Sequence, residues 1–235
     1  MPLDCSPSSP RYERHLALIG GPEGQEQLSR TTIAIVGLGG LGSIVSQYLA
    51  AAGVGRLVLV DPDIVEPNNL NRQLLYDEAS LDLPKAFLAA RRIRSLNSCT
   101  EVTPRRERLT EDNVESLLAE ADIVVDALDN WEARLVLDNY TRRTGKPLVH
   151  AAVERHYGQA MLIIPGKTPG LQAIAPRSPG RSCVQVLGPV VGIVASIESL
   201  LALEAALGNY SRAGTLYVID ARTMDITSIR LQGPG

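Results

Sequence analysis

The chain has 235 residues, 45% of them apolar, and a net charge of −3 with histidine neutral. This length suits one domain, or one domain with an appendage, and the apolar content is enough for a sizeable core. The mildly acidic balance disfavours a nucleic-acid partner, which usually requires a basic face. The beginning of the sequence has no apolar run typical of a signal peptide, so we expect a cytoplasmic protein.

The N-terminal segment, residues 1–9, is rich in proline and serine, which predicts a disordered tail ahead of a single domain over residues 10–235. Cys5 lies in this tail, Cys99 follows a predicted helix, and Cys183 is far from both. Three widely spaced cysteines without a Cys-x-x-Cys pair disfavour a disulfide framework. We therefore expect neither Cys5 nor Cys99 to have a partner.

After two short helices predicted within residues 11–30, the first half of the domain alternates apolar runs with helical segments. The apolar runs are typical of buried parallel strands and occupy 33–36, 57–60, 123–125 and 148–149. Helical spacing occupies 41–52, 85–96, 111–120 and 131–143. This order predicts a doubly wound, Rossmann-like α/β sheet, mainly parallel, over about 30–152. For His150, which ends the last of these strands, we expect core packing or a hydrogen bond and not catalysis.

The second half, about 153–235, has a different pattern. Residues 158–164 alternate like a strand, and a loop rich in proline and glycine follows. The most apolar stretch, 184–207, contains Pro189 and two glutamates, so we expect a buried helix and not a membrane span. Apolar runs near the C-terminus predict a closing hairpin, so the sheet should end in a mixed or antiparallel extension.

A glycine-rich segment, Gly37 to Gly42, fits the pattern G-x-G-x-x-G directly after a predicted strand and before a predicted helix. The first glycine permits a tight turn, the second lets the backbone approach a phosphate, and the last lets the helix pack on the strand. Asp61, at the end of the next strand, can accept hydrogen bonds from ribose hydroxyls. A nucleotide site is therefore predicted, and this pattern alone favours NAD or FAD.

Polar and basic residues downstream favour a triphosphate over a nicotinamide. Arg72 and Lys85 can neutralise phosphate oxygens, and Asn69 can hydrogen-bond to them. Asp129, which follows a predicted strand, is placed to hold Mg²⁺, a cation that prefers carboxylate oxygens. Each residue alone has an ordinary alternative as a solvated side chain or a helix cap. The prediction therefore depends on the whole set, which lies at strand ends and in the loops that follow.

An ordered series of motifs, from about residue 11 to 210, resembles the ThiF/MoeB/HesA family, the bacterial relatives of ubiquitin-activating enzymes. The motifs are Arg11-Tyr12-Glu13-Arg14-His15, Gly37-Leu38-Gly39-Gly40-Leu41-Gly42, Asp61-Pro62-Asp63, Asn69-Leu70-Asn71-Arg72-Gln73, Pro84-Lys85, Asp129-Asn130 and Gly158-Gln159. A lone G-x-G-x-x-G is a weak signal, whereas this series in one order is specific.

The resemblance implies an ATP-dependent adenylyltransferase that activates the C-terminal Gly-Gly carboxylate of a small ubiquitin-like sulfur-carrier protein as acyl-AMP. It implies a homodimer, because Arg14 looks like an arginine finger that reaches the partner's site. The implied ATP site has Asp61 at the ribose and Asp129 at Mg²⁺, and its other members are Gly37, Gly39, Gly40, Gly42, Asn69, Arg72, Gln73, Lys85 and Asn130. Catalysis is then mainly positioning and charge neutralisation, without a general base.

The cysteines depart from the family pattern. Members of the family often hold a structural zinc with two Cys-x-x-Cys pairs, which would fall near residues 170–173 and near the C-terminus, and neither pair exists. A tetrahedral thiolate site cannot be built from three scattered cysteines, so we expect no zinc. Cys183 resembles the family's reactive cysteine. Two interpretations stay open for it, a catalytic thiol activated by Arg181 and an incidental cysteine.

Other functions also stay open. The same adenylation chemistry could act on a peptide or on a tRNA base, although a tRNA enzyme should show a basic face. The chain could instead be a NAD-dependent oxidoreductase, or a scaffold that has kept the fold without catalysis. The pathway, such as thiamine, molybdopterin, tungstopterin or cysteine biosynthesis, is not decided by the sequence. The strand at 158–164 or the C-terminal hairpin could receive the carrier by sheet augmentation.

Overall fold

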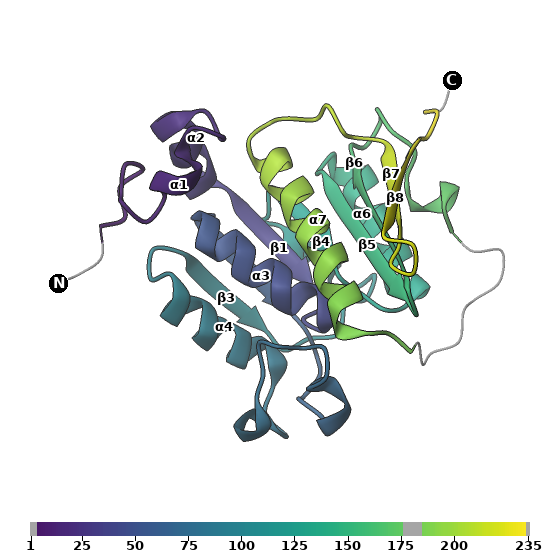
Figure 1. The fold of residues 1–235 in the computed structure, drawn as a ribbon, viewed down its shortest axis with the longest axis horizontal. Coiled ribbons are helices and arrows are strands. Elements are labelled where there is room, and N and C mark those ends of the chain that lie inside the picture. Colours follow the sequence, from purple (N-terminus) through teal and green to yellow (C-terminus); the bar gives the residue numbers. More distant parts are fainter. Residues whose placement is uncertain (1–3, 176–184, 234–235) are drawn as a thin grey trace.

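The structure, a computed structural model, describes residues 4–175 and 185–233 (Figure 1). Their strands form one sheet in the order β3-β2-β1-β4-β5-β6-β7-β8. The strands are β1 Thr32–Val36, β2 Arg56–Val60, β3 Glu101–Arg105, β4 Ile123–Asp126, β5 Leu148–Glu154, β6 Tyr157–Ile163, β7 Thr215–Asp220 and β8 Asp225–Arg230. β1 to β5 run parallel, and β6, β7 and β8 extend the sheet in antiparallel pairs. The predicted fold class is therefore confirmed.

Helices cover both faces of the sheet. The first layer contains α3 Gly40–Ala52, α4 Lys85–Leu96 and α7 Gly188–Ala206, which lie in front of the sheet in Figure 1. The second layer contains α5 Val114–Leu118 and α6 Trp131–Thr144. Along β1, Ile33 and Ile35 join the first buried cluster, whereas Ala34 and Val36 join the second. Both faces of the strand are buried, which is why its sequence is a continuous apolar run.

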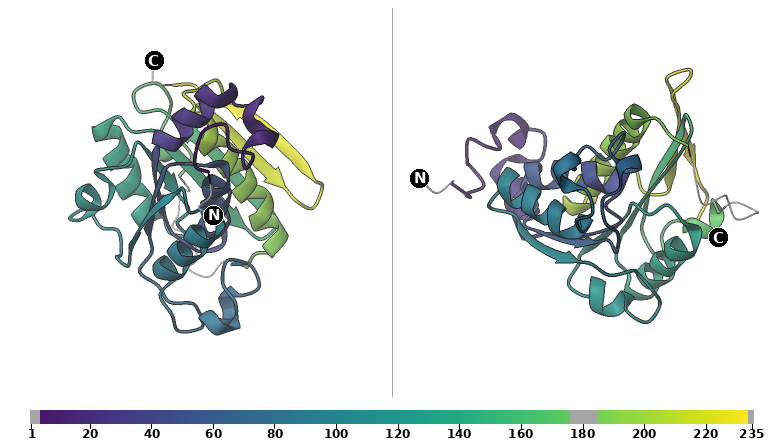
Figure 2. Two further views of the ribbon diagram at one scale, coloured as in Figure 1. Left: turned by 90° about the vertical axis from the view of Figure 1, so that its left-hand side faces the viewer. Right: turned by 90° about the horizontal axis from the view of Figure 1, so that it is seen from below.

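The central strand β1 is a switch point of the sheet. It pairs with β2 on one side and with β4 on the other. The chain winds outward through β2 and β3 and then returns to β4, so the connections after β1 and β4 diverge and leave a crevice at the carboxyl ends of the strands. Figure 2 shows the twist of the sheet and the layers that flank it.

Strand β3 has no counterpart in the predicted elements. Its sequence, Glu-Val-Thr-Pro-Arg, is largely polar and contains a proline. Such a sequence is tolerated because β3 is the outermost strand of the parallel half, where one side of the backbone has no neighbour. Hydrophobic periodicity is weak at an edge, so it did not mark this strand.

The N-terminal segment differs from the predicted disordered tail. Cys5 forms a disulfide with Cys99, 94 residues further along the chain, and their Cα atoms are 5.6 Å apart. Ser9 is buried, and its carbonyl oxygen accepts the N–H of Tyr12 just before α1, Glu13–Leu16. The expectation that Cys5 and Cys99 have no partner was wrong. Sequence spacing does not reveal that the turn after α4 lies beside the N-terminus.

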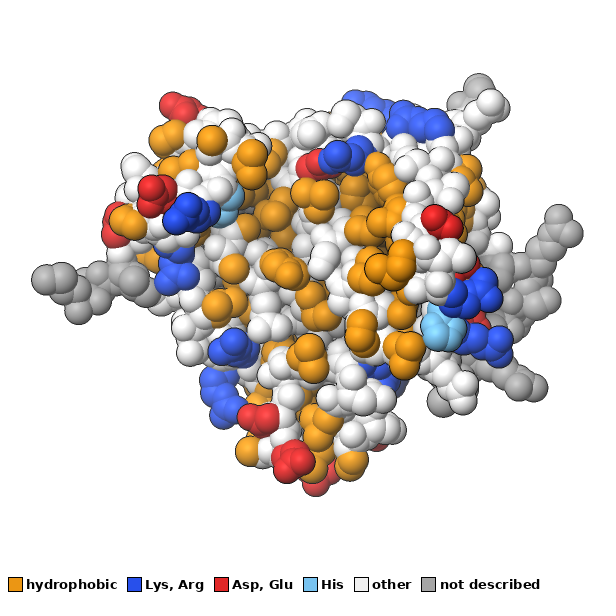
Figure 3. Space-filling model, in the orientation of Figure 1, with side chains coloured by type: hydrophobic (Ala, Val, Ile, Leu, Met, Phe, Trp, Pro, Cys, Tyr) orange, Lys and Arg blue, Asp and Glu red, His pale blue; other side chains and the backbone are white. Residues whose placement is uncertain are grey.

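Within the described ranges, α7 alone is long and apolar enough to cross a membrane by length and composition. Just over half of its apolar window, 56%, is buried, and the helix packs on α3, β5 and β6, so it is the core helix that the sequence predicts. Its outer face remains apolar. Leu200 is 50% exposed there and Tyr48 of the neighbouring α3 is 52% exposed, and hydrophobic side chains gather over this face in Figure 3.

Candidate active site

The glycine-rich turn between β1 and α3 forms one wall of a cleft at the carboxyl ends of the parallel strands. Gly37 has a φ of +94°, and a Cβ there would lie 2.5 Å from the carbonyl oxygen of Ala127. A Cβ at Gly42 would lie 1.9 Å from the carbonyl oxygen of Gly37. Only glycine permits such close contact between the helix and the strand. Because the turn is this tight, no side chain covers these positions, and the N-terminus of α3 stays open toward the cleft.

Asp61 connects this turn to the end of β2. The side chain is 4% exposed, its Oδ2 accepts the N–H of Leu38 at 2.6 Å, and its Oδ1 accepts the N–H of Asp63 at 2.8 Å. Burial raises the pKa of Asp61, and the two N–H groups partly oppose that rise. Asp61 therefore stabilises the glycine turn, and each carboxylate oxygen keeps a lone pair that can accept a ribose hydroxyl.

The loop after Asp61 brings polar side chains to the same wall. Its 3-10 turn η1, Pro67–Asn69, begins with a capping box in which Glu66 and Asn69 bond reciprocally. Asn69 is 6% exposed, and its carbonyl oxygen accepts the N–H of Gln73 at 3.0 Å. The fold of this loop is thus set by local hydrogen bonds, and these bonds determine where Asn69 and Gln73 lie.

Two cations lie in this part of the cleft. Arg72 Nη1 donates to the carbonyl oxygen of Asn68 at 2.7 Å and to Asn71 Oδ1 at 3.0 Å. Lys85 begins α4, is 5% exposed, and places its Nζ 3.7 Å from Asp63 Oδ2. A buried ammonium group beside a single long ion pair can still bind a phosphate oxygen with a charge-assisted hydrogen bond.

The opposite wall begins at the end of β4 with Asp129 and Asn130. Asn130 caps α6, because its Oδ1 accepts the N–H of Ala133 at 2.9 Å, and its Nδ2 donates to Asp129 Oδ1 at 3.3 Å. Asp129 itself is exposed. Among the residues that the structure describes, no three His, Cys, Asp or Glu side chains gather as a metal site. Asp129 could therefore hold Mg²⁺ only together with phosphate oxygens and water, which is how Mg²⁺ commonly binds.

The cleft has a volume of about 1140 Å³. The structure brings all the predicted nucleotide-binding residues except Gly42 to its lining: Gly37, Gly39, Gly40, Asp61, Asn69, Arg72, Gln73, Lys85, Asp129 and Asn130. Gly42 contributes from behind, through its packing on the glycine turn. Pockets of about 300–1,000 Å³ suffice for drug-sized ligands, so this cleft has room for a nucleotide and part of a second substrate.

One predicted catalytic residue that the structure describes, Arg14, does not line this cleft. Arg14 is exposed on α1 and does not line the cleft of its own chain. The preceding Tyr12 is buried and its hydroxyl accepts a hydrogen bond from Asn97 at 3.1 Å, which fixes α1 beside the end of α4. Cys183 and the neighbouring Arg181 lie outside the described residues.

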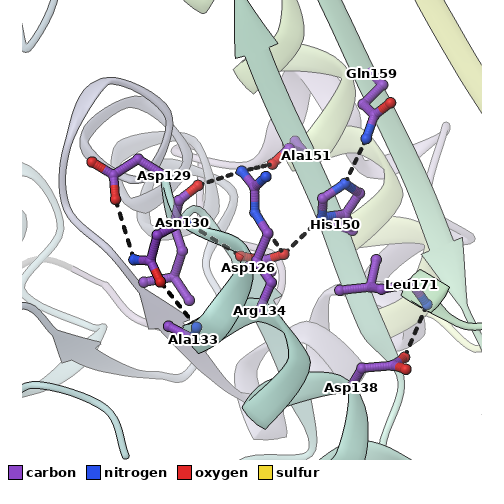
Figure 4. A network of polar contacts seen from close by, with 11 residues as sticks. Asp126, Asp129, Asn130, Ala133, Arg134, Asp138, His150, Ala151, Gln159 and Leu171 are labelled. Carbon is purple, nitrogen blue, oxygen red and sulfur yellow. Dashed lines mark hydrogen bonds and ion pairs between the residues drawn. The ribbon is translucent and has the colours of Figure 1, made fainter. Parts of the chain in front are cut away.

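A buried polar network lies beneath the cleft (Figure 4). Asp126, at the end of β4, contacts His150 on β5 at 2.7 Å and lies 3.6 Å from the Nε of Arg134 on α6. Burial lowers the pKa of His150, although the hydrogen bond to Asp126 opposes this. Nearby on α7, Glu198 is fully buried, and burial raises its pKa well above the usual value.

The sequence reasoning missed Asp126 and Arg134 as parts of this network, and it did not single out the buried Glu198 beside it. No short motif joins them, because they come from β4, α6 and α7. The one available signal was that Asp126 ends an apolar strand beside the predicted crevice, where polar residues commonly serve a site. His150 is fully buried and hydrogen-bonded, as expected of a residue that serves core packing or a hydrogen bond.

Comparisons with known proteins identify the family of this chain. The ThiF family pattern matches residues 12–234. The SAMP-activating enzyme E1 of Haloferax volcanii is 38% identical over 227 residues, covering 93% of this chain and 84% of that protein. The sulfur carrier protein ThiS adenylyltransferase of Escherichia coli is 34% identical over 228 residues, covering 94% of this chain and 91% of that protein.

Longer relatives and more distant structures also match. The chain spans only 50% of the bovine adenylyltransferase and sulfurtransferase MOCS3, to which it is 40% identical over 230 residues, or 94% of this chain. A crystal structure of E. coli MccB with MccA-N7isoASN superposes on this chain with a TM-score of 0.86. The match covers 97% of this chain and 73% of the MccB chain at 23% sequence identity, and an identity this low shows a shared fold alone. Since the family pattern spans nearly the whole chain and two relatives of similar length exceed 30% identity, the chain belongs to the ThiF family.

Proposed function

We propose that this chain is a cytoplasmic, ATP-dependent adenylyltransferase that activates the C-terminal Gly-Gly carboxylate of a small ubiquitin-like sulfur-carrier protein. The carboxylate oxygen attacks the α-phosphorus of ATP. The bond between this phosphorus and the oxygen that bridges it to the β-phosphate breaks, and acyl-AMP and pyrophosphate form. The observation that carries the proposal is the joint placement of the glycine turn, Asp61, Arg72, Lys85 and Asp129 around one cleft. The names of relatives that adenylylate sulfur carriers support the choice of acceptor.

The charges of the cleft support ATP as the nucleotide. Asp61 would bind the ribose, and its position beside the glycine turn at the end of β2 supports this role. Arg72, Lys85 and Asn69 would bind the triphosphate and stabilise the negative charge that develops at the α-phosphate. NAD has only a pyrophosphate, whereas the triphosphate of ATP carries more negative charge for Arg72 and Lys85 to neutralise, so the residues favour ATP over NAD.

Mg²⁺ fits the residues present at Asp129. An exposed carboxylate at the cleft, with one oxygen hydrogen-bonded by the neighbouring Asn130, matches a cation that keeps several waters and binds through one or two carboxylates. Bound there, Mg²⁺ would neutralise phosphate charge. Zinc is not part of the proposal, because the chain has only three cysteines and no Cys-x-x-Cys pair. Cys183 is a candidate thiol for a transfer step after adenylation, a step that ATP–pyrophosphate exchange does not report.

A homodimer is part of the proposal, with Arg14 acting in the site of the partner subunit. Two observations support it. Arg14 is exposed and distant from the cleft of its own chain, and the outer face of α7 and α3 exposes Leu200 and Tyr48. A helix that is apolar on all sides is normally covered, so a second copy of the chain is the occupant we assign to this face.

The carrier would dock at the β8 edge of the sheet. β8 is the last strand, every residue of it is exposed, and Ile226 and Ile229 on it are 55% and 44% exposed. An edge strand with open N–H and C=O groups can accept a strand from a partner, and the exposed isoleucines would add apolar contact. From this edge, the carrier's extended end could enter the cleft along β7 and β6.

The test is carrier-dependent ATP–pyrophosphate exchange with Mg²⁺ and candidate carriers that end in Gly-Gly. Lys85→Ala and Asp129→Ala should lose at least about 100-fold in exchange rate, the range seen when one transition-state charge partner is removed. Lys167→Ala and Asp112→Ala, both exposed and outside the cleft, are the matched controls and should keep the rate. Tight NAD(H) binding without exchange would replace the proposal with an oxidoreductase, and exchange that requires a peptide or tRNA would change the acceptor.

A further inference from the structure

Gln159 lies on the floor of the cleft beside the buried network. It is half-buried on β6, lines the cleft, and places its Nε2 3.0 Å from His150 Nε2. His150 in turn places Nδ1 2.7 Å from Asp126 Oδ2, and both of these residues are fully buried. Figure 4 shows the chain of contacts from Asp126 through His150 to Gln159. A side chain that reaches the ligand space is therefore attached to two side chains that cannot move freely.

The direction of these hydrogen bonds follows from Asp126. Its carboxylate accepts the N–H of Leu128 at 3.2 Å and lies 3.6 Å from Arg134, so it serves as a hydrogen-bond acceptor here. His150 then donates from Nδ1 to Asp126, and burial lowers the pKa of His150, which favours a neutral imidazole with a lone pair on Nε2. Gln159 must donate its amide N–H to this lone pair.

The consequence is that the amide of Gln159 has a defined orientation. Its carbonyl Oε1 faces away from His150, as Figure 4 shows, and among the described residues no group of the chain donates a hydrogen bond to it. The reverse orientation would set a carbonyl oxygen against an imidazole lone pair, which is repulsive. Gln159 therefore presents an acceptor to the cleft and not a donor.

The sheet order gives the distance from this acceptor to the phosphate end of the cleft. Gln159 lies on β6, two strands away from β4, which leads to Asp129, and it pairs in register with Val218 on β7. Adjacent strands lie about 4.8 Å apart, so two spacings are about 10 Å. An extended peptide spans at most about 3.3–3.6 Å per residue, so the last two or three residues of a carrier cover this distance.

We propose that Gln159 Oε1 accepts a backbone N–H of the carrier's Gly-Gly end, and that His150 and Asp126 are positioning residues that fix the amide for this contact. The inference rests on the proposed function and identifies how the site recognises the end of its substrate. Glycines have no side chains to bind, so their backbone groups are the available handles. An acceptor that is oriented before binding avoids the entropy cost of ordering it in the complex.

The experiment uses two semisynthetic carriers with an ester in place of one amide. In the first, glycolate replaces the last glycine, so an ester oxygen replaces the terminal N–H while the carboxylate remains. In the second, glycolate replaces the penultimate glycine. Both are compared with the normal carrier in ATP–pyrophosphate exchange, with the wild-type chain and with Gln159→Met. Gln172→Met, an exposed glutamine outside the cleft, is the matched control.

One ester carrier should lose about fivefold to tenfold in kcat/KM with the wild type, the loss expected for one hydrogen bond. Gln159→Met should lose a similar factor with the normal carrier and lose nothing more with that ester carrier. If the losses from Gln159→Met and from the ester multiply, or if neither ester reduces kcat/KM, the inference is wrong. The proposed function would still stand in both cases, because carrier-dependent exchange would have been observed. An absence of exchange with every carrier would overturn both.

A second variant tests the positioning role. His150→Phe keeps the volume of the buried ring and removes both hydrogen bonds, so the amide of Gln159 can rotate. The KM for the normal carrier should rise about fivefold, the Kd for ATP should stay within twofold of the wild type, and the sensitivity to the ester should disappear. Retained sensitivity to the ester in a folded His150→Phe chain, checked by thermal unfolding, would refute the role of His150.

Discussion

Breaking the Cys5–Cys99 bond measures how much stability the N-terminal attachment contributes. The bond joins residues 94 positions apart, so in the unfolded chain it closes a loop that includes β1, α3, β2 and α4. The loop-closure entropy for this length corresponds to about 4.7 kcal/mol at 25 °C. The folded state keeps other contacts at this end after reduction. Arg11, for example, donates to the carbonyl oxygen of Leu96 at 3.1 Å, so the effect falls mainly on the unfolded state.

The variants are Cys5→Ser, Cys99→Ser and the double substitution, with Cys183→Ser as the control for loss of a thiol. Urea unfolding should show that each single variant loses about 3–5 kcal/mol and that the double variant loses no more than either. Thermal midpoints should fall by about 6–20 °C, since 1 kcal/mol corresponds to roughly 2–4 °C for a domain of this size. Dithiothreitol should reproduce the loss in the wild type and in Cys183→Ser, which both keep the bond, and should leave the other three variants unchanged.

Two results would refute this reasoning. Equal urea midpoints for the wild type with and without reductant would show that the bond does not constrain the unfolded chain. Losses that add in the double variant would show that each cysteine acts through its own packing. The measurement with reductant also gives the stability relevant to a cytoplasm, where thiol pools keep most disulfides reduced.

Two further substitutions test the core and the glycine turn. Glu198 is fully buried and neither carboxylate oxygen has a hydrogen-bond partner among the described residues, so Glu198→Met should raise the free energy of unfolding by about 1–3 kcal/mol. Burial raises the folded-state pKa of Glu198 above 4.5, so the wild type loses stability as pH rises past that value. The gain in urea unfolding should be larger at pH 8 than at pH 5, and an equal gain would contradict this. Gly42→Ala places a Cβ 1.9 Å from the carbonyl oxygen of Gly37, so the Kd for ATP measured by calorimetry should rise at least about tenfold, and an unchanged Kd would contradict the packing argument.

Much of the parallel half could be predicted from the sequence because its signals are local. Helix α4 begins and ends at the predicted residues, 85 and 96, and the strands around the glycine turn are continuous apolar runs. The polar residues of the cleft were also found in advance, since the carboxyl ends of parallel strands meet at one edge of a sheet. The edge strand β3 was missed, because a strand with one free side needs no strong apolar pattern.

The sequence by itself determined the fold class, the glycine turn and the set of residues that gather at the cleft. Only the tertiary structure decided which distant side chains pair: Cys5 with Cys99, and Asp126 with His150 and then Gln159. The physical reason is the range of the interactions. Helical and strand periodicities act over a few residues, whereas these contacts join elements that become neighbours only when the sheet order is set, and one sequence pattern is compatible with several such orders.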